Sequence, residues 1–288
     1  MGNYVFSNKK ALSFFLLPGL ILILVFYLIP FIGGIEYSFT DGTFTNRFVG
    51  FKNYMQLWKN EMFLLGLQNT LELSIICAPL LWILSFLIAV LLEDFKQQNV
   101  AFRSYMLLPY LMPSSALLLV WLIGFDYGGI VNRCLEAMGT VRIMWLESGS
   151  LRIPIIIMFL WKNMGFCVVI FSASLQTIPY AYYEYALLEG AGFLTKIFRI
   201  TLPLIAPNAF LVFFVAWINS FKVYKEVYFI AGAYPDYSVY TLQNYMNNML
   251  ARLDYQSVTS AAYSFAVIVL VLFGILFLFQ RKVDDCFN

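Results

Sequence analysis

Long runs of apolar residues, separated by shorter polar segments, dominate the pattern of this chain. A helix that crosses the hydrocarbon core of a membrane needs about 20 mostly apolar residues. About six runs meet this requirement. They extend from Leu12 to Ile32, Thr70 to Leu92, Tyr105 to Phe125, Pro154 to Leu175, Leu202 to Phe221, and Ala261 to Phe279. The pattern therefore predicts an all-α transmembrane fold.

Proline recurs inside these runs, and each proline removes one backbone donor from a helical ladder. Neighbouring helices must then satisfy the freed carbonyls. This favours bent helices packed around a pathway, although proline is also common in membrane helices of other kinds. The prolines concerned are Pro18, Pro30, Pro79, Pro109, Pro113 and Pro207.

The composition supports a membrane location, since 61% of the residues are hydrophobic and only 12% are charged. An ordinary soluble domain has about 25% charged residues, and a water-soluble fold could not bury this much apolar surface. The formal net charge is +2, and the basic residues are scattered through the loops. Nothing in this distribution indicates a nucleic-acid partner.

The residue types also argue against catalysis and against a bound metal or cofactor. The chain has no histidine, which is the commonest metal ligand and the usual general base. Cys77 and Cys167 lie in apolar runs and are interpreted as small hydrophobic residues. The catalytic patterns H-E-x-x-H and G-x-S-x-G are absent, which disfavours an intramembrane enzyme. The P-loop pattern is absent too, so any ATP would be used by a separate subunit.

The connection between the fourth and fifth runs carries the most informative pattern. It predicts a short helix with Pro179 in its first turn, a sharp break at Gly190 and Gly192, and a second short helix that leads to Pro203. Apolar residues on one side of these helices could enter a groove on another protein. On spacing alone, an ordinary connection whose small residues make a tight turn is the somewhat better interpretation.

This stretch resembles the EAA loop of the permease subunits of ATP-binding-cassette (ABC) importers. The family pattern runs E-A-A, two residues, D-G-A, a gap, F, two residues, I, one residue, L-P, and a second proline four positions later. The residues that take these places are Glu184, Ala186, Gly190, Ala191, Phe198, Ile200, Leu202, Pro203 and Pro207. Two residues depart from the pattern: Tyr185 replaces the usual alanine, and Glu189 replaces the usual aspartate.

The resemblance covers nearly the whole chain and is strongest to carbohydrate permeases of the maltose and glycerol-phosphate type, first permease subunit. Further segments that are similar to this group are Phe48–Tyr54, Asn69–Thr70, Gly129–Asn132 and Trp161–Phe166. Ala231–Pro235 is a departure, because relatives often have G-G-P there. The resemblance implies the six-helix fold of a type I ABC importer permease, which moves a mono- or oligosaccharide across the bacterial cytoplasmic membrane.

By the same resemblance, the EAA loop docks into an ATPase subunit in the cytoplasm, and both termini of this multi-pass chain are cytoplasmic. The implied coupling residues are Glu184, Tyr185, Ala186, Glu189, Gly190, Ala191, Gly192 and Pro203. The implied partners are a second, related permease, an ABC ATPase dimer that uses ATP and Mg²⁺, and an extracytoplasmic sugar-binding protein. This chain itself would bind no cofactor.

The implied organisation has three parts. Residues 1–65 form a cytoplasmic tail, the first helix and an outer loop, and residues 66–280 form a five-helix transmembrane domain. The coupling loop lies at about residues 178–202, and residues 281–288 form a C-terminal tail. The first apolar run is too long for the core of a signal peptide and is expected to be retained.

Polar residues within the runs are candidates for a substrate path. A lysine at the centre of a membrane helix costs roughly 2.5–3.5 kcal/mol, so Lys162 needs a partner or a wet cavity. Lys162 and Asn163, with Asn208 and Asn219, could bind sugar hydroxyls. Alternatively, Lys162 snorkels or pairs with Glu72 and only fixes helix packing.

Two further interpretations stay open from the sequence. A secondary transporter driven by an ion gradient would also use about six or more spans and polar groups at mid-membrane. Four tyrosines cluster where the fourth run ends, and interfacial anchoring explains such a cluster. These are Tyr180, Tyr182, Tyr183 and Tyr185.

Overall fold

The structure is a computed structural model that describes residues 9–43, 47–93, 99–147 and 149–287. Residues 1–8 of the expected N-terminal tail lie outside these ranges. Within the described ranges, the chain forms helices and connecting turns, with one isolated antiparallel bridge between Thr40 and Phe48.

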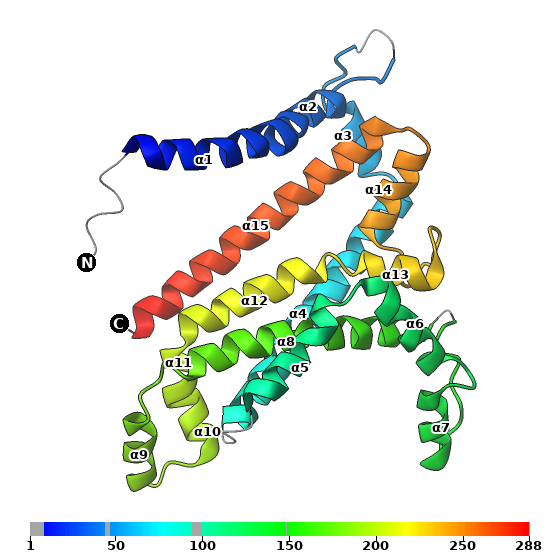
Figure 1. Cartoon of the computed structure of the whole chain (residues 1–288). Helices are drawn as coiled ribbons and strands as arrows, with labels where there is room; N and C mark the ends of the chain where they lie inside the picture. Colours follow the sequence, from blue (N-terminus) through cyan, green and yellow to red (C-terminus); the bar gives the residue numbers. More distant parts are fainter. Residues whose placement is uncertain (1–8, 44–46, 94–98, 148, 288) are drawn as a thin grey trace. The chain divides into compact units, whose positions relative to one another are not determined.

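Helices follow one another along the described chain, joined by short connections (Figure 1). They are α1 (Lys9–Ile23), α2 (Ile29–Ser38), α3 (Lys52–Leu57), α4 (Glu61–Glu93), α5 (Asn99–Leu111), α6 (Ser114–Phe125), α7 (Ile130–Ala137), α8 (Arg152–Leu175), α9 (Ala181–Leu188), α10 (Phe193–Lys196), α11 (Leu202–Leu204), α12 (Ala206–Ser220), α13 (Tyr224–Ala231), α14 (Leu242–Ala251) and α15 (Tyr255–Phe287). Two π turns, Leu24–Leu28 and Ile197–Thr201, continue α1 into α2 and α10 into α11.

Six stretches of the described chain are helical, long and apolar enough to cross a membrane, which confirms the predicted all-α transmembrane fold. They are Leu16–Ser38, Glu61–Glu93, Ser114–Ala137, Arg152–Leu175, Ala206–Ala231 and Tyr255–Leu278. Most side chains of the first stretch are exposed, as expected for a helix that faces lipid. The last helix, α15, continues to Phe287 and so includes residues of the expected C-terminal tail.

The third predicted span, Tyr105 to Phe125, is wrong as a single helix, because the chain there forms α5 and α6. The break lies at Met112 and Pro113, where Pro113 has an extended backbone with ψ of 134°. A proline cannot donate a backbone hydrogen bond and clashes with the preceding turn of a helix. Pro109, by contrast, is accommodated inside α5.

The described chain divides into two compact units, and the smaller one comprises residues up to Leu64 together with Met246–Leu270. In this unit the Tyr263 hydroxyl donates to the Phe31 carbonyl, and the two rings meet edge to face. Asn53 joins α3 to the end of α2, since its Nδ2 donates to the carbonyls of Ser38 and Thr40 at 2.9 and 2.8 Å. These contacts hold the first apolar helix within its unit.

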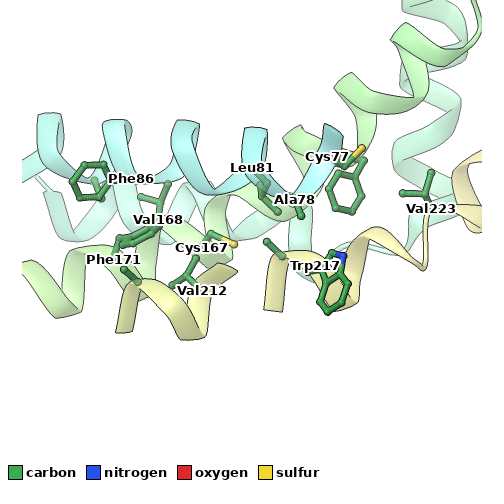
Figure 2. Close-up of a cluster of buried hydrophobic side chains, with 14 of the residues drawn as sticks. Cys77, Ala78, Leu81, Phe86, Cys167, Val168, Phe171, Val212, Trp217 and Val223 are labelled. Atoms are coloured by element: carbon green, nitrogen blue, oxygen red, sulfur yellow. The ribbon is translucent and has the colours of Figure 1, made fainter. Parts of the chain in front are cut away.

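The larger unit, Leu65–Tyr245 with the chain from Val271, contains the main core, where α4, α8 and α12 pack together. Figure 2 shows Phe86 of α4 beside Val168 and Phe171 of α8, and the rings of Phe86 and Phe171 are 5.5 Å apart. Cys77 and Cys167 are buried in this core, in agreement with their interpretation as small hydrophobic residues. In lipid, such close packing rather than exclusion of water drives helices together.

Helix α8 also packs closely on α5, at a point where only glycine fits. A Cβ added at Gly165 would overlap the backbone carbonyl of Met106. Small residues at helix crossings allow backbones to approach closely in membranes. Gly165 therefore places α5 directly against α8, the helix that leads to the connection singled out in the sequence.

Candidate functional site

The connection between the fourth and fifth spans begins with a turn that leads into α9. The Pro179 carbonyl accepts from the Tyr182 N–H at 3.1 Å, and the Tyr180 carbonyl accepts from the Tyr183 N–H at 2.9 Å. Helix α9 begins at Ala181, with Tyr180 as its N-cap. Pro179 thus precedes the helix, and its predicted place in the first turn is wrong by a small margin.

Helix α9 ends in a Schellman motif at Gly190, which has a φ of 72°. The Gly190 N–H donates to the Leu187 carbonyl at 3.0 Å, and the Ala191 N–H donates to the Ala186 carbonyl at 2.8 Å. Gly190 therefore makes the predicted break. Gly192 does not contribute in the same way, because its φ of −70° is one that any residue adopts.

The surface of α9 is largely uncovered by the other residues that the structure describes. Tyr185 is 70% exposed and Leu188 is 84% exposed, whereas Tyr183 and Ala186 are half-buried. Glu184 and Glu189 are exposed and flank this apolar surface with negative charge. Neighbouring apolar side chains at the surface are typical of a contact with another protein or with lipid. We call the exposed side chains of Tyr182, Tyr185, Leu187 and Leu188 the α9 surface.

A π turn, Ile197–Thr201, links α10 to α11, and the Leu202 N–H closes it on the Ile197 carbonyl. Pro203 occupies a first-turn position of α11, as the sequence predicts. Pro203 has no backbone N–H to donate to the preceding turn. This missing donor is a local reason for the irregular backbone hydrogen bonds of the π turn just before it. The π turn thus leads directly into the fifth span.

A cavity of about 640 Å³ lies beneath α9 and α10, beside the ends of α4 and α8. Its lining combines apolar side chains with the polar ends of tyrosine, threonine, glutamate and lysine side chains. Tyr183 of α9 and Thr201 of the π turn are among the lining residues. Figure 1 shows α9 and α10 at one end of α8, and α7 at the other.

Lys162, the first candidate for the substrate path, pairs with a carboxylate that the sequence analysis did not single out. Its Nζ lies 3.5 Å from Glu226 Oε1 of α13 and donates to the Ser114 hydroxyl at the start of α6. The predicted alternative partner, Glu72, is wrong, because Glu72 pairs instead with Arg152 at 2.8 Å. Lys162 therefore forms an ion pair, as the alternative interpretation expected, but its partner is Glu226.

The three asparagine candidates have separate environments. Asn163 is buried and donates to the Phe159 carbonyl of its own helix at 2.8 Å. Asn208 is exposed, and the Asn219 side chain accepts from Lys222 Nζ at 3.2 Å. No hydrogen bond joins any two of the four candidates in the described chain. Their role in a substrate path remains a prediction.

Glu226 was not predicted, because it lies beyond Phe221, where the fifth predicted span ends. It is 4% exposed, and the neighbouring Val223 and Val227 are also buried. Val223 and Val227 are four residues apart, and this helical spacing is the signal that could have indicated a helix containing the acid. Lys162 is partly buried, so its charge favours such a partner.

Arg152 organises a second polar cluster that sequence reasoning did not anticipate. Its guanidinium donates to Glu72, to Asn69 Oδ1 at 2.6 Å and to the Ser238 carbonyl at 2.6 Å. Asn69 donates in turn to the carbonyls of Tyr237 and Tyr240 at 2.7 and 2.9 Å. Asn69, which belongs to one of the segments that resemble sugar permeases, thus anchors the chain that precedes α14.

A comparison with protein families finds one that matches almost the whole chain. The family is described as binding-protein-dependent transport system inner membrane component, and its model matches residues 3–285.

Curated relatives with similar sequences are transport permeases. The sulfoquinovosyl glycerol transport system permease protein of Agrobacterium fabrum is 29% identical over 212 residues, which are 72% of this chain and 68% of that protein. The sn-glycerol-3-phosphate transport system permease protein of Yersinia pestis is 28% identical over 262 residues, 89% of this chain and 88% of the relative. The trehalose/maltose transport system permease protein of Thermococcus litoralis is 29% identical over 235 residues, 80% of each chain.

A similar solved structure is a chain of a bacterial alginate ABC transporter in complex with an alginate pentasaccharide-bound periplasmic protein. It is 24% identical, with a TM-score of 0.82 over 95% of each chain. At this identity, the likeness establishes the shared fold.

Proposed function

Because this chain belongs to the family of binding-protein-dependent transport system inner membrane components, we propose that it is a membrane-spanning permease subunit of an ATP-driven ABC importer for a sugar. The curated relatives named above support a sugar or a sugar-like polyol derivative as the substrate class. The observation that carries the proposal is the exposed apolar helix α9, which ends at Gly190 between the fourth and fifth spans.

In this proposal, α9 docks into a cleft of an ABC ATPase subunit through Tyr185 and Leu188. Both side chains are large, and an exposed apolar group gains most when a partner removes it from water. Glu184 and Glu189 lie at the edge of the contact, where basic side chains of the ATPase would complement them. The departures at Tyr185 and Glu189 would then enlarge the docking surface and retain its negative charge.

The same proposal sets the direction of the chain across the membrane. With α9 in the cytoplasm, alternate crossings place both termini in the cytoplasm and put α3, α7 and α14 outside. An extracytoplasmic binding protein would deliver the sugar to that outer side, and a second, related permease would complete the pathway. The ATPase dimer would hydrolyse ATP with Mg²⁺, and this chain would take part through movement alone.

A matched pair of variants tests the docking surface. Leu188→Asp should reduce recovery of the ATPase with the tagged permease at least about tenfold, since a buried, unpaired carboxylate is costly in an interface. Val141→Asp is the control, because Val141 is equally exposed at 85% but lies in the connection between α7 and α8. The measurement is co-purification, followed by ATPase activity stimulated by the loaded binding protein. Full ATPase recovery with Leu188→Asp would contradict the proposal.

A further inference from the structure

Helix α9 is joined to the helix bundle mainly through one side chain. Of its eight residues, all of which the structure describes, Tyr183 is the one whose side chain packs against the main core and makes a hydrogen bond. The Tyr183 hydroxyl lies 3.0 Å from Thr201 Oγ1. The exposed tyrosines on either side, Tyr182 and Tyr185, make no such contact with other residues that the structure describes.

The direction of this hydrogen bond follows from the partners of Thr201. The Thr201 hydroxyl has one proton, which it donates to the Lys196 carbonyl at 3.2 Å. The proton between the two side chains therefore comes from Tyr183. The resulting chain of hydrogen bonds runs from Tyr183 to Thr201 and on to Lys196.

Thr201 is itself rigidly placed, because it is 4% exposed and ends the π turn that leads into the fifth span. Single π turns are often found at functional positions in helices, where the hydrogen-bond ladder can shift by one residue. A force applied at Thr201 would act on the part of the helix where the backbone hydrogen bonds are irregular. Pro203, two residues later, prevents the preceding turn from closing in the ordinary way.

The cavity beneath α9 is a place where close packing is interrupted. It has a volume of about 640 Å³, and residues of α9, of α10 and of the ends of α4 and α8 line it. Close-packed interiors transmit displacement, whereas a void does not. Tyr183 and Thr201 both line this cavity, and a hydrogen bond joins their side chains at its wall.

We propose that the Tyr183–Thr201 hydrogen bond transmits the movement of α9 into the π turn and the fifth span. This inference rests on the proposed function, in which the ATPase moves α9. Tyr183 is then a positioning residue that acts through Thr201. The fifth span, which follows α9 in the chain, receives the movement in preference to α8, which precedes it.

Two variants remove the hydrogen bond with little change of shape: Tyr183→Phe and Thr201→Val. In the complete reconstituted transporter, each should lower the amount of sugar moved per ATP hydrolysed by about 2–10-fold, the range expected for one neutral hydrogen bond. The double variant should lower it no further, because both changes remove the same interaction. Recovery of the ATPase and the melting temperature of the complex should stay near the wild-type values.

Matched controls separate this link from general damage. Tyr182→Phe removes the same hydroxyl from an exposed position of α9 and should leave sugar moved per ATP unchanged. Thr201→Ser keeps the acceptor oxygen and should retain coupling.

Three outcomes would overturn the inference: wild-type coupling in both single variants, additive losses in the double variant, or loss of ATPase binding together with coupling. The proposed function would survive the first two, because neither of them concerns the binding of an ATPase to α9.

Discussion

Gly190 shows how one residue decides the geometry of the connection between the fourth and fifth spans. Its φ of 72° closes the Schellman motif, and no neighbouring atom would obstruct a Cβ there. Any cost of substitution at Gly190 is therefore conformational. Gly192, two residues later, has an ordinary backbone and open space around it, so it offers a nearly ideal comparison.

At this scale we predict that Gly190→Ala raises local opening of α9, and that Gly192→Ala does not. A non-glycine residue in the left-handed region costs about 1–2 kcal/mol, which corresponds to about a 5–30-fold change in a local equilibrium. Hydrogen–deuterium exchange of the amides of residues 185–191 measures this change. Equal exchange in the two variants would mean that the positive φ is not what ends the helix.

At the scale of elements, partly buried polar pairs hold helices in register where apolar packing alone is nondirectional. Lys162 of α8 meets Glu226 of α13 and Ser114 of α6, so one ammonium group connects three helices. The Arg152 cluster connects α4 and α8 to the segment before α14 in the same manner. Breaking a buried ion pair is much more harmful than removing both of its charges.

We predict that Lys162→Met and Glu226→Gln each destabilise the protein by about 3–5 kcal/mol, because each leaves one charge buried without its partner. The double variant should be more stable than the sum of the single effects implies. Thermal unfolding of the detergent-solubilised protein measures all three. Lys222→Met is the control, since it removes an exposed lysine from the connection between α12 and α13. Additive single effects would show that the two residues do not stabilise each other.

For the whole molecule, labelling of the native cysteines tests the membrane topology of the chain. Cys134 is exposed on α7, whereas Cys77 and Cys167 are buried in the core. Leu194 of α10 is exposed and lies beyond the opposite end of α8. A helix of 24 residues is about 36 Å long, enough to place these two positions on opposite sides of a bilayer.

In a Cys286→Ser background, a membrane-impermeant maleimide should label Cys134 in right-side-out vesicles and not in inside-out vesicles. A Leu194→Cys variant that also carries Cys134→Ser should show the reverse. Both labelling results are expected if α9 and α10 lie in the cytoplasm. Labelling of Leu194→Cys from the outside would invert the proposed topology and remove the basis for an ATPase contact.

The number of spans, and the approximate bounds of all but the third, could be predicted from the sequence alone, because the thickness of the hydrocarbon core sets the length of an apolar helix. The family could be recognised as well, since the order of Glu184, Gly190 and Pro203 is specific and lies within one short segment. The break at Pro113 was not predicted, although its cause is local. Pro109 has the same chemistry and stays helical, so the outcome depends on neighbouring helices.

Contacts between distant residues were decided only by the tertiary structure. The sequence shows that Lys162 needs a counter-charge, but the choice of Glu226 over Glu72 depends on how α13 packs against α8 and α6. In the same way, Tyr183 is indistinguishable from its exposed tyrosine neighbours until α9 folds back toward the π turn at Thr201. Spacing along the chain sets the length and the apolar character of each helix. Only packing determines which face of a helix meets which partner.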